Sequence, residues 1–202
     1  MMIDSPSNPS ATLVLAHGAG AGQKSPFMVR FAGGMALRHI SAATFDFPYI
    51  VAGRKVPDRA PVLEASWREA LDAAHTKFKG LRLVIGGKSM GGRMASHIAA
   101  QGVETVDGLV FLGYPLHPPG KPNQRRDVHL PAIKERMLFV QGTRDPFGTA
   151  DDIRALLRSL QHAELHEVAG GDHSFKVPGR KNDPLEGIMD AVAAWILGNA
   201  EC

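Results

Sequence analysis

Cysteine is nearly absent from this chain of 202 residues, since the only one is Cys202 at the last position. A single cysteine excludes an internal disulfide framework, and it also excludes a zinc site built from cysteines. Long hydrophobic runs are lacking too. The first apolar run, residues 13–16, is far too short for a signal-peptide core or a membrane span. We therefore expect a cytoplasmic protein without a membrane partner.

An excess of charge of one sign is also lacking. Lys and Arg number 23 against 20 Asp and Glu, a formal net charge of +3, and the basic residues are spread along the chain. The closest approach to a basic cluster, Lys121 with Arg125 and Arg126, is interpreted as a solvated loop, so we expect no nucleic-acid partner. Length and composition predict a single domain over residues 1–202, with a flexible N-terminus at residues 1–10, that acts as a monomer or a homodimer.

The order of short apolar runs and helical segments predicts an α/β fold. Short runs rich in branched or aromatic residues are typical of parallel strands that helices cover on both faces. Apolar residues at spacings of three and four predict helices. One further helix is expected to begin at Ser25, and another is expected to end at Ala100. The expected strands are about six, mostly parallel, at residues 12–16, 42–47, 81–86, 106–112, 136–141 and 163–168. The helical patterns cover residues 61–79, 153–160 and 185–196.

One long irregular segment, residues 114–134, lies between two of the predicted strands. Four prolines within eight residues prevent a regular helix at its start. The segment follows the carboxyl end of a predicted strand, which is the edge at which open parallel sheets bind ligands. Loops this long in compact domains are often functional, so we expect this one to lie beside a functional site.

A Gly87-x-Ser89-x-Gly91 motif lies between the 81–86 strand and the helix that follows it. This is the setting of a nucleophile elbow, in which a serine occupies a strained, tight turn. A side chain two positions before or after the serine would collide with a neighbouring strand or helix, and glycine avoids that collision. The motif makes Ser89 the candidate nucleophile.

A serine nucleophile needs a base and a group that orients the base. After an elbow of this kind the acid comes next along the chain and the histidine last, each just past a strand. Asp145 and His173 have these positions, so Asp145 would hold the ring of His173, which would take the proton of Ser89. Asp172 is an alternative acid, although as the neighbour of His173 it would point the other way.

Acyl transfer also requires hydrogen-bond donors for the oxyanion of the tetrahedral intermediate. The backbone N–H of Met90, directly after the candidate nucleophile, is one. The loop at residues 17–22 should supply the other, which we assign to the N–H of Ala19. The glycines of that loop also resemble a dinucleotide fingerprint, but the third glycine comes one position early. No cofactor and no metal site are expected.

Four segments together resemble the α/β-hydrolase superfamily over nearly the whole chain: His17-Gly18 and residues 87–92 (GKSMGG), 142–145 (GTRD) and 171–174 (GDHS). The segment GYPLHPPGKP that begins at Gly113 is similar to small bacterial hydrolases of the testis-expressed and NSL-complex hydrolase-like branch, and more distantly to dienelactone hydrolases. The resemblance implies a serine hydrolase of ester-like substrates with a reduced α/β-hydrolase fold.

No segment between the 106–112 strand and Asp145 is long enough for a helical lid, which argues against interfacial lipase action on long chains. The expected substrate is a small soluble ester or thioester, cleaved through an acyl-enzyme, with Tyr114, His117 and Lys88 as candidates for lining the pocket. The alternative is a catalytically silent binding or interaction module, because a fold does not determine a function. Five basic residues would make the rim of the pocket basic and so favour a substrate with an acidic acyl group: Lys88, Lys121, Arg125, Arg126 and Arg144.

Overall fold

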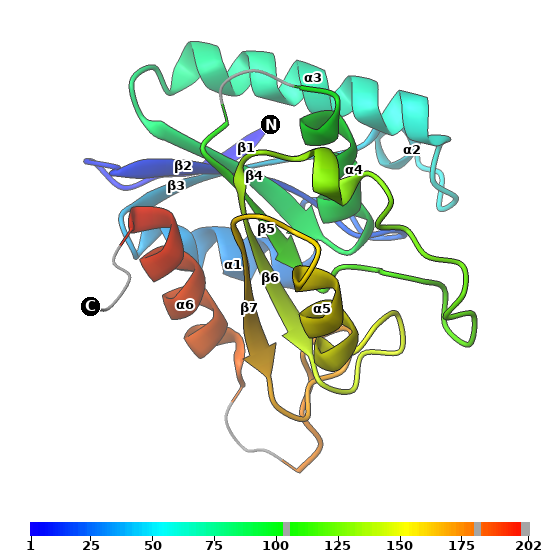
Figure 1. Ribbon diagram of the computed structural model, residues 1–202. Coiled ribbons are helices and arrows are strands. Elements are labelled where there is room, and N and C mark those ends of the chain that lie inside the picture. Colours follow the sequence, from blue (N-terminus) through cyan, green and yellow to red (C-terminus); the bar gives the residue numbers. More distant parts are fainter. Residues whose placement is uncertain (103–105, 180–182, 199–202) are drawn as a thin grey trace.

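The structure, a computed structural model, describes residues 1–102, 106–179 and 183–198. Within them, seven strands form one sheet in the order β1-β3-β2-β4-β5-β6-β7 (Figure 1). All neighbouring strands pair in parallel except β1, which is antiparallel to β3. The strands are β1 (Met2–Asp4), β2 (Ala11–Ala16), β3 (Ile40–Phe45), β4 (Arg82–Lys88), β5 (Gly108–Leu112), β6 (Arg136–Gly142) and β7 (Ala163–Val168).

Helices cover the sheet on both faces (Figure 1). One face carries α1 (Pro26–Ala36) and α6 (Leu185–Leu197), and the other carries α2 (Pro48–Val51), α3 (Ala60–Lys77), α4 (Met90–Ala100) and α5 (Ala150–Leu157). Each face has its own apolar cluster. Every residue of β2, β3 and β5 is buried, and most of these residues are apolar, as expected of strands that helices cover on both sides.

The chain changes direction across the sheet at β2. From β2 it passes through α1 to β3 on one side, and from β3 it returns through α3 to β4 on the other side of β2. The segments that leave β2 and β4 therefore go to opposite faces, and a crevice opens between the carboxyl ends of these two strands. Ser89 follows β4 at this crevice, and the 17–22 loop follows β2.

The six strands and the main helices expected from the sequence are all present, with ends shifted by a few residues. The strand count needs one correction. Met2, Ile3 and Asp4 form β1 and pair with Thr44, Ala43 and Ala42, inside the segment for which a flexible N-terminus was expected. A three-residue edge strand carries too short a pattern to stand out in a sequence. The short helix α2, after Phe47, was also not predicted.

The segment between β5 and β6 contains one short 3-10 turn, η1 (Leu130–Ala132), and no lid is built from it. In the described part of the chain, no helix combines the length and the hydrophobicity required to cross a bilayer. The turn carries His129, whose ring lies against α4. Its Nε2 is 2.7 Å from the Ser96 hydroxyl, and the ring packs edge-on against His97.

Burial, with further contributions from the charges of His97 and Arg93, lowers the pKa of His129 to about 4, from 6.5. As the pH falls from 6.5 towards 4, the unfolded chain therefore binds a proton at this histidine while the folded chain does not. Stability is fully present above pH 6.5 and decreases below it. We expect His129→Gln to reduce the loss of melting temperature between pH 7 and pH 4.5.

Burial lowers the pKa of His17 and His166 as well, so some of that pH dependence should remain in the variant. The exposed His39 provides the matched control, because His39→Asn removes a histidine that the fold does not bury. Equal slopes in wild type and His129→Gln, measured by thermal unfolding at several pH values, would contradict the assignment.

Candidate active site

The turn after β4 approaches the backbone of β2 so closely that two of its positions cannot carry a side chain. A Cβ added at Gly87 would lie 2.2 Å from the carbonyl oxygen of Ala16, and one added at Gly91 would lie 2.3 Å from the same oxygen. Real Cβ atoms essentially never come within 3.0 Å of such an atom. Both glycines of the motif are therefore required by contact with one atom of the neighbouring strand.

Ser89, between these glycines, has a φ of 50° and a ψ of −115°. A non-glycine residue rarely adopts a positive φ, and such strain is typical of functional turns. The backbone is held there by the Ser89 N–H, which donates to the carbonyl of Leu112 on β5 at 3.1 Å, and by the start of α4. The strained turn leaves the side chain of Ser89 exposed to the crevice at the edge of the sheet.

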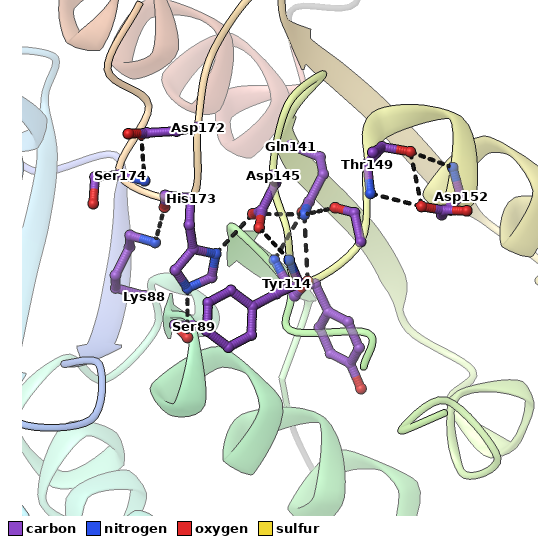
Figure 2. Close-up of polar contacts among 12 residues, drawn as sticks. Lys88, Ser89, Tyr114, Gln141, Asp145, Thr149, Asp152, Asp172, His173 and Ser174 are labelled. Carbon is purple, nitrogen blue, oxygen red and sulfur yellow. Dashed lines mark hydrogen bonds and ion pairs between the residues drawn. The ribbon is translucent and has the colours of Figure 1, made fainter. Parts of the chain in front are cut away.

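The structure brings Ser89, His173 and Asp145 together (Figure 2). The Nε2 atom of His173 is 2.9 Å from the hydroxyl oxygen of Ser89, and its Nδ1 atom is 2.7 Å from Oδ2 of Asp145. Since a carboxylate only accepts hydrogen bonds, Nδ1 carries the proton and Nε2 is left free to accept from the serine. Asp172 is not the partner of the ring, because its Oδ1 accepts the backbone N–H groups of Ser174 and Lys176.

Asp145 is 1% exposed, yet three donors satisfy its carboxylate. Besides His173, they are the backbone N–H of Phe147, at 2.8 Å, and the side-chain amide of Gln141, at 2.9 Å (Figure 2). The amide of Gln141 also donates to the carbonyl of Gly148, and its oxygen accepts the N–H of Tyr114. Gln141 thus ties the acid to the loops after β5 and β6, which fixes the direction in which Asp145 faces the histidine.

The loop that carries His173 is fastened at several points. The Thr143 hydroxyl accepts the N–H of Gly170, the ring of Phe147 packs on that of His173 at 4.3 Å, and Lys88 Nζ donates to the His173 carbonyl. Burial lowers the pKa of Lys88 to about 8, against the opposite effect of Asp145 and Asp172. At neutral pH Lys88 therefore keeps the proton that it donates.

The two predicted oxyanion donors belong to residues that line the same cavity as Ser89. Met90 is the first residue of α4, where backbone N–H groups lack an acceptor within the helix. The N–H of Ala19 and the carbonyl of Gly18 belong to the same peptide group. That carbonyl lies 2.8 Å from Nδ1 of His17. Loop 17–22 lies directly beside the elbow, because a Cβ added at Gly18 would touch Ser89 Cβ at 3.7 Å.

His17 is completely buried, and its tautomer follows from its contacts. The Phe47 N–H donates to Nε2 at 3.2 Å, so Nδ1 carries the hydrogen and donates to the Gly18 carbonyl. Burial lowers the pKa of His17 and keeps the ring neutral, against the opposing effects of its bond to Gly18 and the charge of Asp46. His17 therefore fixes the orientation of the peptide whose N–H is the predicted oxyanion donor.

A cavity of about 1130 Å³ opens over Ser89 and His173. Its walls come from the loops after β2 and β7, the starts of α1 and α6, the first turn of α4 and the segment between β5 and β6. Among the described residues, no group of three His, Cys, Asp or Glu side chains could hold a metal ion.

Of the three predicted lining residues, only Lys88 lines this cavity. The ring of Tyr114 lies instead in the core on the α3 and α4 side, where it contacts Phe111 and Phe139, and its hydroxyl donates to the carbonyl of Arg126. His117 also does not line the cavity. Its backbone N–H donates to the Phe147 carbonyl, and its ring bonds to its own loop.

Three further residues of the site were not predicted from the sequence. Gln141 is the only amide in an otherwise apolar stretch of β6, which is a signal that could have been noticed. His17 follows a buried strand directly, and Arg93, which lines the cavity, lies four residues after Ser89 and hence on the same side of α4.

The arrangement corresponds to the α/β-hydrolase class of proteins. Residues 9–200 match the alpha/beta hydrolase domain family, so the chain belongs to that family of hydrolase-fold proteins. The narrower branch suggested by the segment at Gly113 stays a prediction.

Solved structures with the same fold cover nearly all of the chain. Dienelactone hydrolase from Anabaena variabilis is 21% identical, with a TM-score of 0.77 over 97% of this chain and 89% of that one. A monoacylglycerol lipase from Paleococcus ferrophilus is 16% identical, with a TM-score of 0.75 over 98% of this chain and 99% of that one. An alpha-beta serine hydrolase homologue from Coxiella burnetii is 15% identical, with a TM-score of 0.74 over 98% of this chain and 90% of that one.

The contact at the elbow can be tested by a pair of glycine substitutions. We expect Gly91→Ala to lower the free energy of unfolding by about 1–3 kcal/mol, because the new methyl group would overlap the Ala16 carbonyl. Gly33→Ala, in α1, meets nothing within 4 Å and should stabilise the protein by roughly 0.5–1 kcal/mol. Urea unfolding measures both, and a neutral Gly91→Ala would disprove the steric requirement.

Proposed function

We propose that this protein is a serine hydrolase that cleaves a small soluble carboxylic ester or thioester through an acyl-enzyme. The observation that carries the proposal is the continuous chain of contacts from Asp145 through His173 to Ser89, with the serine held on a strained turn. Each residue is at hydrogen-bond distance from the next, as the mechanism of such a triad requires.

In the first step, the Ser89 oxygen attacks the carbonyl carbon of the substrate while its proton passes to Nε2 of His173. Asp145 stabilises the positive charge that then forms on the ring. The N–H groups of Met90 and Ala19 donate to the oxyanion. When the tetrahedral intermediate collapses, His173 returns the proton to the leaving alcohol or thiol, and the acyl group stays on Ser89.

In the second step a water molecule takes the place of the leaving group. His173 removes a proton from the water, the resulting hydroxide attacks the acyl-enzyme, and the acid leaves as Ser89 recovers its proton. The residues placed around Ser89 are sufficient for each proton transfer, so no cofactor enters the proposed cycle. Hydrolysis requires water to reach Ser89, and the cavity is open to solvent above it.

The size of the substrate is inferred from the segment between β5 and β6. In this chain it contains only η1, so it forms no helical lid of the kind that would suit interfacial action on long acyl chains. The absence of such a lid among the described residues favours a small soluble ester. As part of the same proposal, the enzyme acts in the cytoplasm, as a monomer or a homodimer.

A binding or interaction module with the same fold is the alternative. A module without chemistry has no need for a buried carboxylate aligned with a histidine and a strained serine, and those features cost stability. The geometry therefore favours the enzyme.

The proposal is tested with a fluorophosphonate probe, detected by intact mass, and with 4-nitrophenyl acetate and butyrate. We expect one adduct on the wild-type protein and none on Ser89→Ala, together with a loss of kcat of at least about 1000-fold. Asp145→Asn should retain the fold but lose about as much activity, because an amide can donate to Nδ1 and so favours the wrong tautomer of His173.

The exposed Ser174 lines the same cavity, so Ser174→Ala serves as the matched control and should keep the adduct. An unlabelled and well-folded wild-type protein would refute the activated serine and favour the binding module.

A further inference from the structure

The cavity over Ser89 differs in character between its two ends. On the α1 and α6 side most of the lining is apolar, although Arg30, Lys176 and Asp183 also line it, and on the α4 side the lining carries two arginines. The apolar lining includes Pro26, Phe27, Met28, Phe175, Val177 and Leu185, whereas Arg93 and Arg126 line the other end with Pro115. Ser89 lies where the two ends meet, because β4 delivers it to the crevice between the two faces of the sheet.

Arg93 is placed by the helix that begins at the nucleophile. It follows Ser89 by one turn, its N–H donates to the Ser89 carbonyl, and helical side chains lean back towards the preceding turn. Its Nε lies 3.5 Å from Nε2 of His97, whose Nδ1 is 2.9 Å from a carboxylate oxygen of Glu64. This contact holds the guanidinium at its Nε atom.

Arg126 comes from the long segment between β5 and β6, and its backbone is anchored at two points. Its N–H donates to the Leu116 carbonyl at 2.9 Å, and its carbonyl accepts the hydroxyl of the buried Tyr114 at 2.6 Å. The polar end of Tyr114 therefore fixes the backbone of a residue that lines the cavity. The conformation of this proline-rich segment thereby places a second arginine in the lining of the cavity that Arg93 also lines.

Neither arginine forms an ion pair with a carboxylate in the part of the chain that the structure describes. Burial and the nearby charge of Arg126 both lower the pKa of Arg93, so the two cations repel one another. Arg30, at the other end of the cavity, differs, since it pairs with Asp183 and Glu186. The charge of Glu64, which reaches Arg93 through His97, acts on the pKa of Arg93 in the opposite direction, but no described carboxylate contacts either guanidinium directly, so an anionic group would complete the site.

We propose that Arg93 and Arg126 bind a carboxylate group of the substrate, so that the preferred ester carries a carboxylate on one side of the scissile bond and an apolar group on the other. This inference rests on the proposed serine hydrolase and names its substrate class. Guanidinium groups suit a carboxylate because they offer parallel N–H donors to both of its oxygens. Lys88 adds positive charge near the same serine.

Two pairs of esters test the inference, each differing by one negative charge. In the first pair the charge is in the acyl group: 4-nitrophenyl hydrogen adipate against 4-nitrophenyl methyl adipate. In the second it is in the leaving group: 4-carboxyphenyl butyrate against 4-(methoxycarbonyl)phenyl butyrate. We expect kcat/KM to be at least about tenfold higher for the charged member of one pair, after correction for hydrolysis without enzyme.

Variants then assign that preference to the two arginines. In Arg93→Gln and in Arg126→Gln the ratio of charged to neutral kcat/KM should fall about tenfold. Arg125→Gln is the matched control, because Arg125 is exposed, pairs with Asp127 and does not line the cavity, and its ratio should stay as in the wild type. Circular dichroism confirms that each variant is folded.

The outcomes separate this inference from the proposed function. Hydrolysis of the neutral esters without preference for either charged partner overturns the carboxylate site and leaves the hydrolase intact. A preference that persists in the double variant Arg93→Gln, Arg126→Gln also overturns the assignment. If no ester is hydrolysed, the proposed function has failed. Calorimetric titration with adipate then tests the carboxylate site independently of catalysis. Binding to the wild type that is lost in the double variant supports the site, and an absence of binding to the wild type refutes it.

Discussion

The close backbone contact between the end of β2 and the turn after β4 is the constraint on which the candidate site depends. Gly87 and Gly91 both rest against the Ala16 carbonyl, so Ser89 is held directly beside the loop that leaves β2. That proximity is what brings the N–H of Ala19 to the same cavity as the serine. A larger residue at either glycine would move Ser89 away from the N–H of Ala19, the predicted oxyanion donor on the neighbouring loop, and the other parts of the site could not compensate.

A second constraint is electrostatic. The carboxylate of Asp145 is buried, and a buried charge requires several hydrogen bonds in compensation. Gln141 and the N–H of Phe147 supply two of them and leave one oxygen for the ring of His173. The same interactions that stabilise the buried charge also orient it. In this protein, stability and the alignment of the acid are therefore properties of one network.

Much of the fold and the core of the site can be predicted from the sequence, because their signals are local. Buried parallel strands are apolar runs, and the glycines around Ser89 leave a spaced pattern. The contribution of β1 could not be found in this way, since its pairing with β3 depends on residues about forty positions away. The role of Tyr114 was misjudged for a related reason, because nothing in its local sequence shows which face of the sheet its ring joins.

The topology also accounts for the two-sided cavity. Since the chain reverses its direction across the sheet at β2, the elements beside Ser89 come from both faces, and each face contributes its own chemistry. On one face the starts of α1 and α6 meet through apolar side chains. On the other, the first turns of α4 leave room for Arg93, and the segment after β5 folds back to add Arg126. The turn that exposes Ser89 thus also determines that the two sides of the cavity around it differ in chemistry.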